Sequence, residues 1–113
     1  MEDINKFVRE LRKDFSGEPL DESHINPNPL LQFEHWFKEA VKADVNEPNA
    51  MVLSTVAENH KPSARVVLLR EFTTNGFAFF TNYQSRKAED LVKNPNACLT
   101  FFWPELERQI RIE

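Results

Sequence analysis

Apolar residues in the first part of the chain recur every three or four positions, the spacing of one helix face. This pattern predicts two helices, over residues 3–15 and over residues 29–43. Asp3 is a candidate N-cap for the first. Asn28 can cap the second, and Pro29 suits its first position because a proline there gives up no helical hydrogen bond. The expected apolar face of the second helix consists of Leu30, Phe33, Phe37 and Ala40.

From residue 50 onward the pattern changes to runs of β-branched and aromatic residues that are separated by turn sequences. Asn75-Gly76 is the strongest hairpin signal in the chain. A short helix is predicted from residue 85 to residue 94, because Pro95 stops it. The predicted strands cover residues 51–57, 64–70, 77–81, 97–103 and 108–112.

The predicted strands are apolar on both faces, whereas an antiparallel sheet with one wet face would alternate more cleanly. We therefore expect a mainly β fold, an antiparallel β-barrel with helices packed outside. One sheet face would line the barrel interior, and the helices or a partner subunit would cover the other. In the run over residues 97–103, the two faces consist of Leu99, Phe101 and Trp103 and of Cys98, Thr100 and Phe102.

The length of 113 residues corresponds to one structural domain, with a helical region over residues 1–48 and a strand region over residues 49–113. Two glycines are too few for the glycine-rich loops that bind phosphates in P-loop and dinucleotide-binding proteins. A single cysteine, Cys98, excludes a disulfide framework within the chain and a cysteine-based zinc site. The three histidines lack ligand spacing, so no metal site is expected.

The net charge of −4 is unevenly distributed. Residues 1–60 contain 6 basic and 12 acidic residues, and residues 61–113 contain 8 basic and 6 acidic residues. This mildly basic second half is too weak for general nucleic-acid binding but suits a small anion. No apolar run approaches the roughly 20 residues of a membrane span. The acidic N-terminus is unlike a signal peptide, so we expect a cytoplasmic protein.

Ser85-Arg86-Lys87 begins the short predicted helix. Cations at the first helical positions oppose the helix dipole, at a cost of about 0.3–1 kcal/mol each. An anion bound at this helix terminus would reverse the sign of that effect. The triplet is consistent with two interpretations, a phosphate site or a solvated surface pair.

Two arginines flank the apolar run over residues 65–70. In a regular strand Arg65 and Arg70 lie on opposite faces. They could bind two different anions, or both could be surface charges at the strand ends. Gln109 lies in the last predicted strand, where a buried amide would need partners such as the edge of a heterocycle. The alternative is an exposed strand residue.

The order and spacing of four segments resemble the pyridoxamine 5′-phosphate oxidase family. The resemblance implies an FMN-dependent split-barrel homodimer with its active sites at the subunit interface. Such enzymes oxidise pyridoxamine or pyridoxine 5′-phosphate to pyridoxal 5′-phosphate, with hydride transfer from the substrate C4′ to flavin N5, and O2 becomes H2O2. The four segments are residues 50–56, 65–70, 79–87 and 102–109.

The resemblance also implies roles for individual residues. Arg65, Arg86 and Lys87 would bind the FMN phosphate, and Gln109 would hydrogen-bond the isoalloxazine. The full implied FMN set is Arg65, Val66, Val67, Leu68, Leu69, Phe80, Thr81, Arg86, Lys87 and Gln109.

The implied substrate ligands are Arg70 and Arg12. The family usually has a lysine where Arg70 stands, and an arginine keeps the charge with a different geometry. Phe15 replaces a family tyrosine in the N-terminal segment that covers the substrate. Both departures fall on the substrate side of the implied site.

Family members continue past Glu113, and the resemblance implies that their catalytic residues lie there. The chain ends within its last predicted strand, which leaves an open sheet edge. It is therefore expected to be the N-terminal part of such an oxidase. The alternatives are a truncated, non-catalytic flavin-binding or assembly module of the same fold, or a split-barrel domain that binds nothing.

Overall fold

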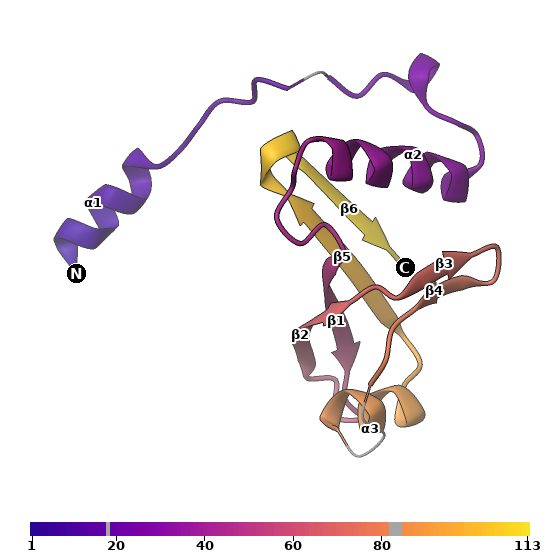
Figure 1. Cartoon of the computed structure of the whole chain (residues 1–113). Helices are drawn as coiled ribbons and strands as arrows, with labels where there is room; N and C mark the ends of the chain where they lie inside the picture. The colour runs from indigo at the N-terminus through magenta and orange to yellow at the C-terminus, as the bar shows by residue number, and fades with distance from the viewer. Residues whose placement is uncertain (18, 82–84) are drawn as a thin grey trace.

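The computed structural model describes residues 1–17, 19–81 and 85–113. Figure 1 shows one twisted sheet and a small hairpin with helices beside them, and the N-terminal helix clear of both. The elements in chain order are α1 (Glu2–Glu10), η1 (Glu22–His24), α2 (Pro29–Lys42), β1 (Ala50–Val56), β2 (Pro62–Leu68), β3 (Glu71–Thr73), β4 (Gly76–Ala78), α3 (Arg86–Lys93), β5 (Ala97–Trp103), η2 (Pro104–Leu106) and β6 (Arg108–Ile112).

The main sheet has four antiparallel strands in the order β2-β1-β5-β6. The register aligns Val66 with Val52, Val52 with Thr100, and Thr100 with Arg111, so these four residues form one row across the sheet. Within the described ranges, β2 and β6 each pair on one side only. The hairpin of β3 and β4 forms a separate two-stranded sheet.

One face of the main sheet, here called the inner face, forms the core. Phe33 of α2 lies at its centre, with ring centroids 5.2 Å from Phe101 and 6.3 Å from Trp103. The hairpin closes the same core, because the rings of Phe72 and Phe77 lie 4.9 and 5.0 Å from the Phe33 ring. The inner-face strand residues that are buried are Met51, Leu53, Thr55, Val67, Leu99, Phe101 and Trp103.

Several predicted elements are confirmed. Helix α2 starts at Pro29, and the Asn28 side chain accepts hydrogen bonds from the amides of Leu30 and Leu31. Helix α3 follows Ser85, whose hydroxyl accepts from the Ala88 amide at 3.4 Å. Strands β5 and β6 have the predicted bounds. In each case the signals are local, a cap, a proline or an apolar run.

The predicted first helix is wrong in its bounds. Helix α1 ends at Glu10, and Met1 instead of Asp3 is its N-cap. All of its residues are exposed, and Figure 1 shows it clear of the sheet. With no surface to pack against, the apolar stripe has no tertiary contact that would extend the helix to residue 15. No helix among the described residues has the length and apolar character needed to cross a bilayer.

The predicted strand over residues 77–81 is also shorter in the structure. It ends at Ala78 and pairs with β3, a short strand that was not predicted, because the turn after Thr73 aligns Thr73 with Gly76. Phe80 and Thr81 therefore lie outside any strand. The strand predicted over residues 64–70 is β2, and it ends at Leu68. Leu69 and Arg70 therefore belong to the connection from β2 to β3.

Within the described residues the helices cover one face of the sheet, so the expected cover of the other face would come from a partner subunit. On the outer face, Val66 and Phe102 are each 67% exposed, and Leu68 is 38% exposed. Helices α2 and α3 both pack on the inner side, which leaves the outer face without a covering layer. The fold is thus an antiparallel, mainly β architecture with one completed face.

Candidate functional site

The start of α3 carries the predicted anion-binding residues. Arg86 is exposed and Lys87 half-buried, at the first two helical positions. The Thr81 hydroxyl lies 3.5 Å from that of Ser85, which joins the preceding segment to the cap. Free amides of a first helical turn and two cations thus share one end of α3, a combination that favours an anion.

Arg65 lies on the inner face and is half-buried. Its Nη1 donates to the Leu53 carbonyl at 3.0 Å and to the Thr55 hydroxyl at 2.9 Å. The same hydroxyl lies 3.1 Å from Oδ2 of Asp90, on α3. This connection links Arg65 to the helix that carries Arg86 and Lys87.

The other residues predicted around Arg65 divide between two faces, as regular alternation requires. Val67 and Leu69 are buried on the inner side, and Val66 and Leu68 are exposed on the outer face. The two buried side chains are therefore closed to a ligand, and the Leu69 amide already donates to the Asn49 carbonyl at 2.8 Å.

Arg70 lies after the end of β2, in the connection to β3, so strand alternation does not determine its direction. It is exposed, and its guanidinium carbon lies 5.5 Å from the ring centroid of Phe80, which is itself 80% exposed. The two arginines therefore do not converge on one anion within a single chain. Arg12 is exposed in the segment after α1, which projects away from the sheet (Figure 1), so the structure does not bring it to Arg70.

Gln109 lies on the outer face of β6, opposite Phe102 of β5, and is exposed. The strand order β2-β1-β5-β6 puts three strand spacings between Gln109 and the β2 residues. At about 4.8 Å per spacing this separation is about 14 Å. The structure therefore does not bring Gln109 together with Arg65 within one chain.

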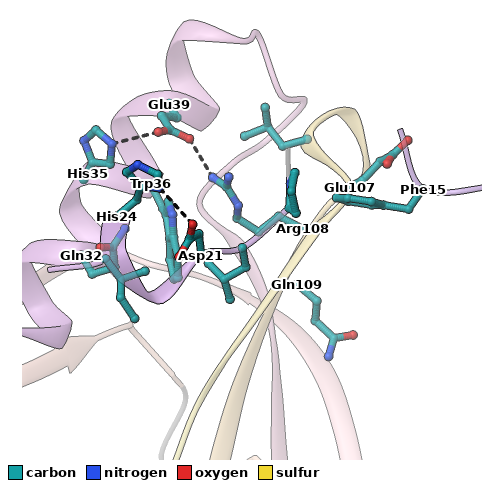
Figure 2. Close-up of a pocket in the computed structure, with 14 residues that line it drawn as sticks. Phe15, Asp21, His24, Gln32, His35, Trp36, Glu39, Glu107, Arg108 and Gln109 are labelled. Carbon is teal, nitrogen blue, oxygen red and sulfur yellow. Dashed lines mark hydrogen bonds and ion pairs between the residues drawn. The ribbon is translucent and has the colours of Figure 1, made fainter. Parts of the chain in front are cut away.

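Residues 11–28, here called the N-terminal connector, join α1 to α2. A cavity of about 520 Å³ lies between this connector, α2 and the start of β6 (Figure 2). Three carboxylates line it, from Asp21, Glu39 and Glu107. Gln109 is at its margin, with its side chain directed away from Trp36. An excess of carboxylates makes this cavity a poor site for a phosphate.

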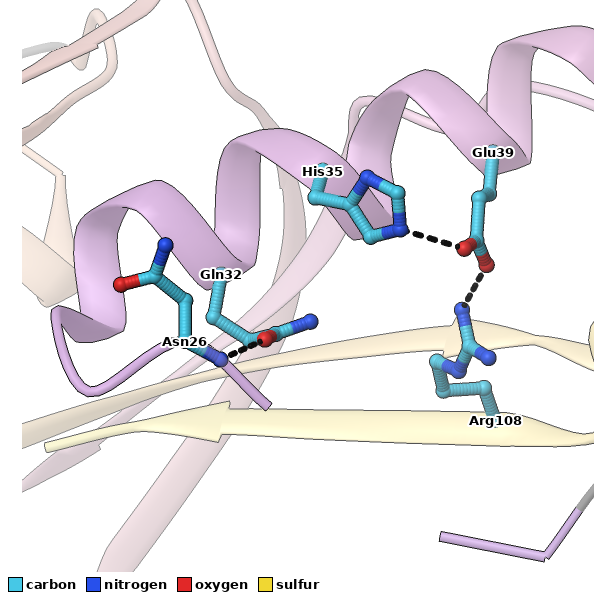
Figure 3. A network of polar contacts seen from close by, with 5 residues as sticks. All are labelled: Asn26, Gln32, His35, Glu39 and Arg108. Atoms are coloured by element: carbon cyan, nitrogen blue, oxygen red, sulfur yellow. Dashed lines mark hydrogen bonds and ion pairs between the residues drawn. The ribbon is translucent and has the colours of Figure 1, made fainter. Parts of the chain in front are cut away.

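The cation in this cavity already has partners (Figure 3). Arg108 Nη1 lies 2.8 Å from a Glu39 oxygen, and its guanidinium carbon lies 5.2 Å from the Trp36 ring centroid. The other Glu39 oxygen lies 2.9 Å from Nε2 of His35. This network joins α2 to the start of β6, next to Gln109, and gives the cavity a structural role.

Glu107 anchors the N-terminal connector. Its carboxylate accepts hydrogen bonds from the Ser16 amide at 2.8 Å, the Ser16 hydroxyl at 3.0 Å and the Gly17 amide at 3.1 Å. These bonds, the Ser16 amide foremost, lower the pKa of Glu107 from its ordinary value of 4.5. Glu107 has a left-handed backbone, with φ at 51°, at the turn into β6.

Sequence reasoning missed two polar residues in the candidate site. Thr55 shares the buried face of β1 with Met51 and Leu53, and Asp90 is 6% exposed on α3. The sequence contained one signal for Thr55. Its position falls on the apolar face of its strand, and a buried hydroxyl needs a hydrogen-bond partner. The identity of that partner is a tertiary fact, because Asp90 lies 35 positions further along the chain.

Comparison with known proteins assigns the chain to a family. The family model described as "Pyridoxamine 5'-phosphate oxidase" matches residues 37–113, more than half of the chain. The chain belongs to this family. The matched region includes the predicted FMN residues and residues 82–84 of the resembling segment, which lie outside the described residues.

Two relatives named pyridoxine/pyridoxamine 5′-phosphate oxidase have similar identities. One from a Cyanothece species is 54% identical over 106 residues, and one from Actinobacillus succinogenes is 55% identical over 106 residues. Each match covers 94% of this chain and 50% of the relative. The chain thus spans about half the length of the curated relatives it matches.

Two solved structures share the fold. PhzG from Burkholderia lata 383, in complex with tetrahydrophenazine-1-carboxylic acid, matches 87% of this chain and 50% of its own, with a TM-score of 0.80 at 28% identity. A pyridoxamine 5′-phosphate oxidase-related, FMN-binding protein from Nostoc punctiforme covers 79% of this chain and 46% of its own, with a TM-score of 0.63 at 22% identity. The mainly β, split-barrel fold expected from the sequence is confirmed, and the chain contains part of it.

Proposed function

We propose that the chain forms the FMN-binding N-terminal part of an oxidase that converts pyridoxamine or pyridoxine 5′-phosphate to pyridoxal 5′-phosphate. The observation that carries this proposal is the connection of Arg65 to α3, whose first residues are the cations Arg86 and Lys87. Family membership and the names of the relatives support it.

The residues at α3 fit the phosphate of FMN in their chemistry. A phosphate accepts hydrogen bonds through several oxygens, and Arg86, Lys87 and the first-turn amides of α3 are all donors. Arg65 would add a planar guanidinium from β2. When bound, FMN supplies the acceptor for a hydride, and the protein supplies binding and orientation.

The isoalloxazine would contact β2 and the segment before α3. Val66 and Leu68 are exposed, as is Phe80, and they offer apolar side chains to a ring. Val67 and Leu69 would contribute by fixing β2 against the core, since their side chains are buried and the Leu69 amide donates to the Asn49 carbonyl. The side of β2 away from β1 has no strand beside it in the described ranges, so backbone donors and acceptors remain there for a heterocycle. Thr81 would join this group through its position beside Ser85.

We infer that the complete site needs two copies of the chain. Gln109 lies about three strand spacings, roughly 14 Å, from β2, so a Gln109 that bonds a flavin held at β2 would come from a partner subunit. The exposed apolar outer face supports a homodimer, because isolated chains seldom leave such a face in water. Arg70 would bind the substrate phosphate from the exposed side of this arrangement, and Arg12 would join it when the N-terminal segment folds over the substrate.

The test is a titration of the full chain with FMN, followed by flavin fluorescence, and then oxygen consumption with pyridoxamine 5′-phosphate. Tight FMN binding with turnover supports the proposal. FMN binding without turnover would identify a non-catalytic flavin-binding or assembly module. The absence of FMN binding would contradict both and leave a split-barrel domain without this cofactor.

A further inference from the structure

The buried strand residues described on the inner face are apolar except for Thr55, which contacts Asp90 of α3. Thr55 is 1% exposed and Asp90 is 6% exposed, and the Thr55 hydroxyl lies 3.1 Å from the Asp90 carboxylate. A buried carboxylate is costly unless it is hydrogen-bonded. Such a pair between β1 and α3 fixes their relative position more narrowly than apolar packing does, because hydrogen bonds are directional.

The direction of the hydrogen bonds follows from the groups involved. A guanidinium can only donate and an ionised carboxylate can only accept. The Thr55 hydroxyl therefore accepts from Arg65 Nη1 and donates its own proton to Asp90 Oδ2. Because one hydroxyl serves both neighbours, its loss removes both bonds at once.

This chain of bonds joins two parts of the proposed phosphate site. Arg65 comes from β2, whereas Arg86 and Lys87 come from the start of α3, which packs beside β1 (Figure 1). Asp90 is the fifth residue of α3, so it lies one turn after Arg86 on the same helix. A shift of Asp90 would therefore move Arg86 and Lys87 relative to Arg65.

We propose that Thr55 and Asp90 are positioning residues that hold Arg65 and the cationic start of α3 in register for one phosphate group. The role rests on the proposed function, since it concerns the FMN phosphate. It does not require either residue to touch the ligand. If the role is correct, loss of the Thr55–Asp90 contact lowers the affinity for a ligand with a phosphate more than the affinity for the flavin ring alone.

The experiment compares FMN with riboflavin, which has the same ring system and no phosphate, in the full chain. Two substitutions remove the contact, Thr55→Val and Asp90→Leu, and two keep it, Thr55→Ser and Asp90→Asn. Glu89→Gln is the matched control, because it removes an acidic charge from an exposed neighbour on α3. Circular dichroism and urea unfolding establish that each variant is folded. If one of the two apolar variants fails to fold, the binding data of the other test the proposal.

We expect Thr55→Val and Asp90→Leu to weaken FMN binding by about tenfold, the effect of one hydrogen bond to a charged group, and riboflavin binding by less than about twofold. Thr55→Ser, Asp90→Asn and Glu89→Gln should keep the preference of the unmodified chain for FMN over riboflavin. An unchanged preference in folded Thr55→Val or Asp90→Leu would overturn the positioning role, as would equal losses for both ligands. If the unmodified chain binds neither ligand, it is the proposed function that fails.

Discussion

On the inner face of the four-stranded sheet, Leu53 and Phe101 are at most 1% exposed beneath the helices, whereas Val66 and Phe102 on the outer face are each 67% exposed. Both sets are apolar, so composition does not explain the difference. The inner face is covered by the chain's own α2, α3 and β3-β4 hairpin. The comparison indicates that one copy of this sequence completes its core but not its outer surface. The residues proposed for FMN come from both faces of β2, from the start of α3 and from the outer face of β6.

The largest expected effect is on the inner face. Phe33→Ala should lower the free energy of unfolding by about 3–5 kcal/mol, because its ring packs against rings from α2, the hairpin and β5 and its loss leaves a cavity. Phe102→Ala on the outer face should change it by less than about 1 kcal/mol at concentrations where the chain is monomeric. Urea unfolding measures both. Similar losses in the two variants would contradict the contrast between the faces.

The second prediction concerns the start of α3. Arg86→Glu together with Lys87→Glu should weaken FMN binding by at least about a hundredfold, since two charge-assisted hydrogen bonds are lost. In the absence of ligand the same change should stabilise the chain by about 0.3–1 kcal/mol per residue, because acidic residues suit a helix N-terminus. Fluorescence titration and urea unfolding measure these opposite effects.

Lys93→Glu is the matched control for this pair. It makes one such charge reversal, half the charge change of the pair, at the opposite end of α3, where Lys93 lies 3.4 Å from Glu58. FMN affinity should stay within about threefold there, because helix-terminal electrostatic effects fall off within one turn. Equal losses of FMN affinity at both ends would indicate a general charge effect and no phosphate site at Ser85.

Local signals predicted the elements well, and tertiary contacts account for what they missed. Asn28 and Pro29 sufficed to predict the start of α2, because a cap acts within a few residues. The apolar stripe of α1 predicted a longer helix, but none of its residues is buried against the described part of the chain. Sequence alone gave no access to the contact of Thr55 with Asp90 or to the strand order that separates Gln109 from β2.

The third prediction tests whether each flavin site is built from residues of two subunits. If Gln109 serves the partner's flavin, Arg65→Ala and Gln109→Ala impair the same site from different subunits. Co-expression of the two variants then gives mixed dimers in which one site is intact and the other carries both changes. With random pairing about a quarter of all sites regain the FMN affinity of the unmodified chain, as two-fold symmetry requires.

Titration of the co-expressed mixture against each variant alone measures this recovery. Light scattering gives the oligomeric state of the same samples. Phe102→Asp offers a further control, because a charge on the bare face should disfavour pairing while leaving the inner core intact. A mixture that regains no site, despite dimers, would mean that Gln109 and Arg65 act within one chain.

The smallest expected effect concerns Ser16 and Gly17 in the N-terminal connector, which the exposed carboxylate of Glu107 bonds to the turn before β6. Three hydrogen bonds from Ser16 and Gly17 stabilise the ionised form of Glu107 and lower its pKa below 4.5. A lowered pKa in the folded state means that this stabilisation is fully present above pH 4.5 and is lost as the pH falls through the lower value. The connector should therefore detach only in acid, while the core stays folded.

Amide proton shifts of Ser16 and Gly17, followed by NMR as the pH is lowered, should titrate together with a midpoint below 4.5. Glu107→Gln should abolish this titration. The amide of Ser23 is an internal reference, because it donates to Asp21, whose pKa is likewise lowered, chiefly by that bond, and it should titrate in both proteins. A titration midpoint at or above pH 4.5 for the Ser16 amide would mean that the Glu107 carboxylate does not hold the connector in solution. The connector would then be free of the folded core, as α1 is.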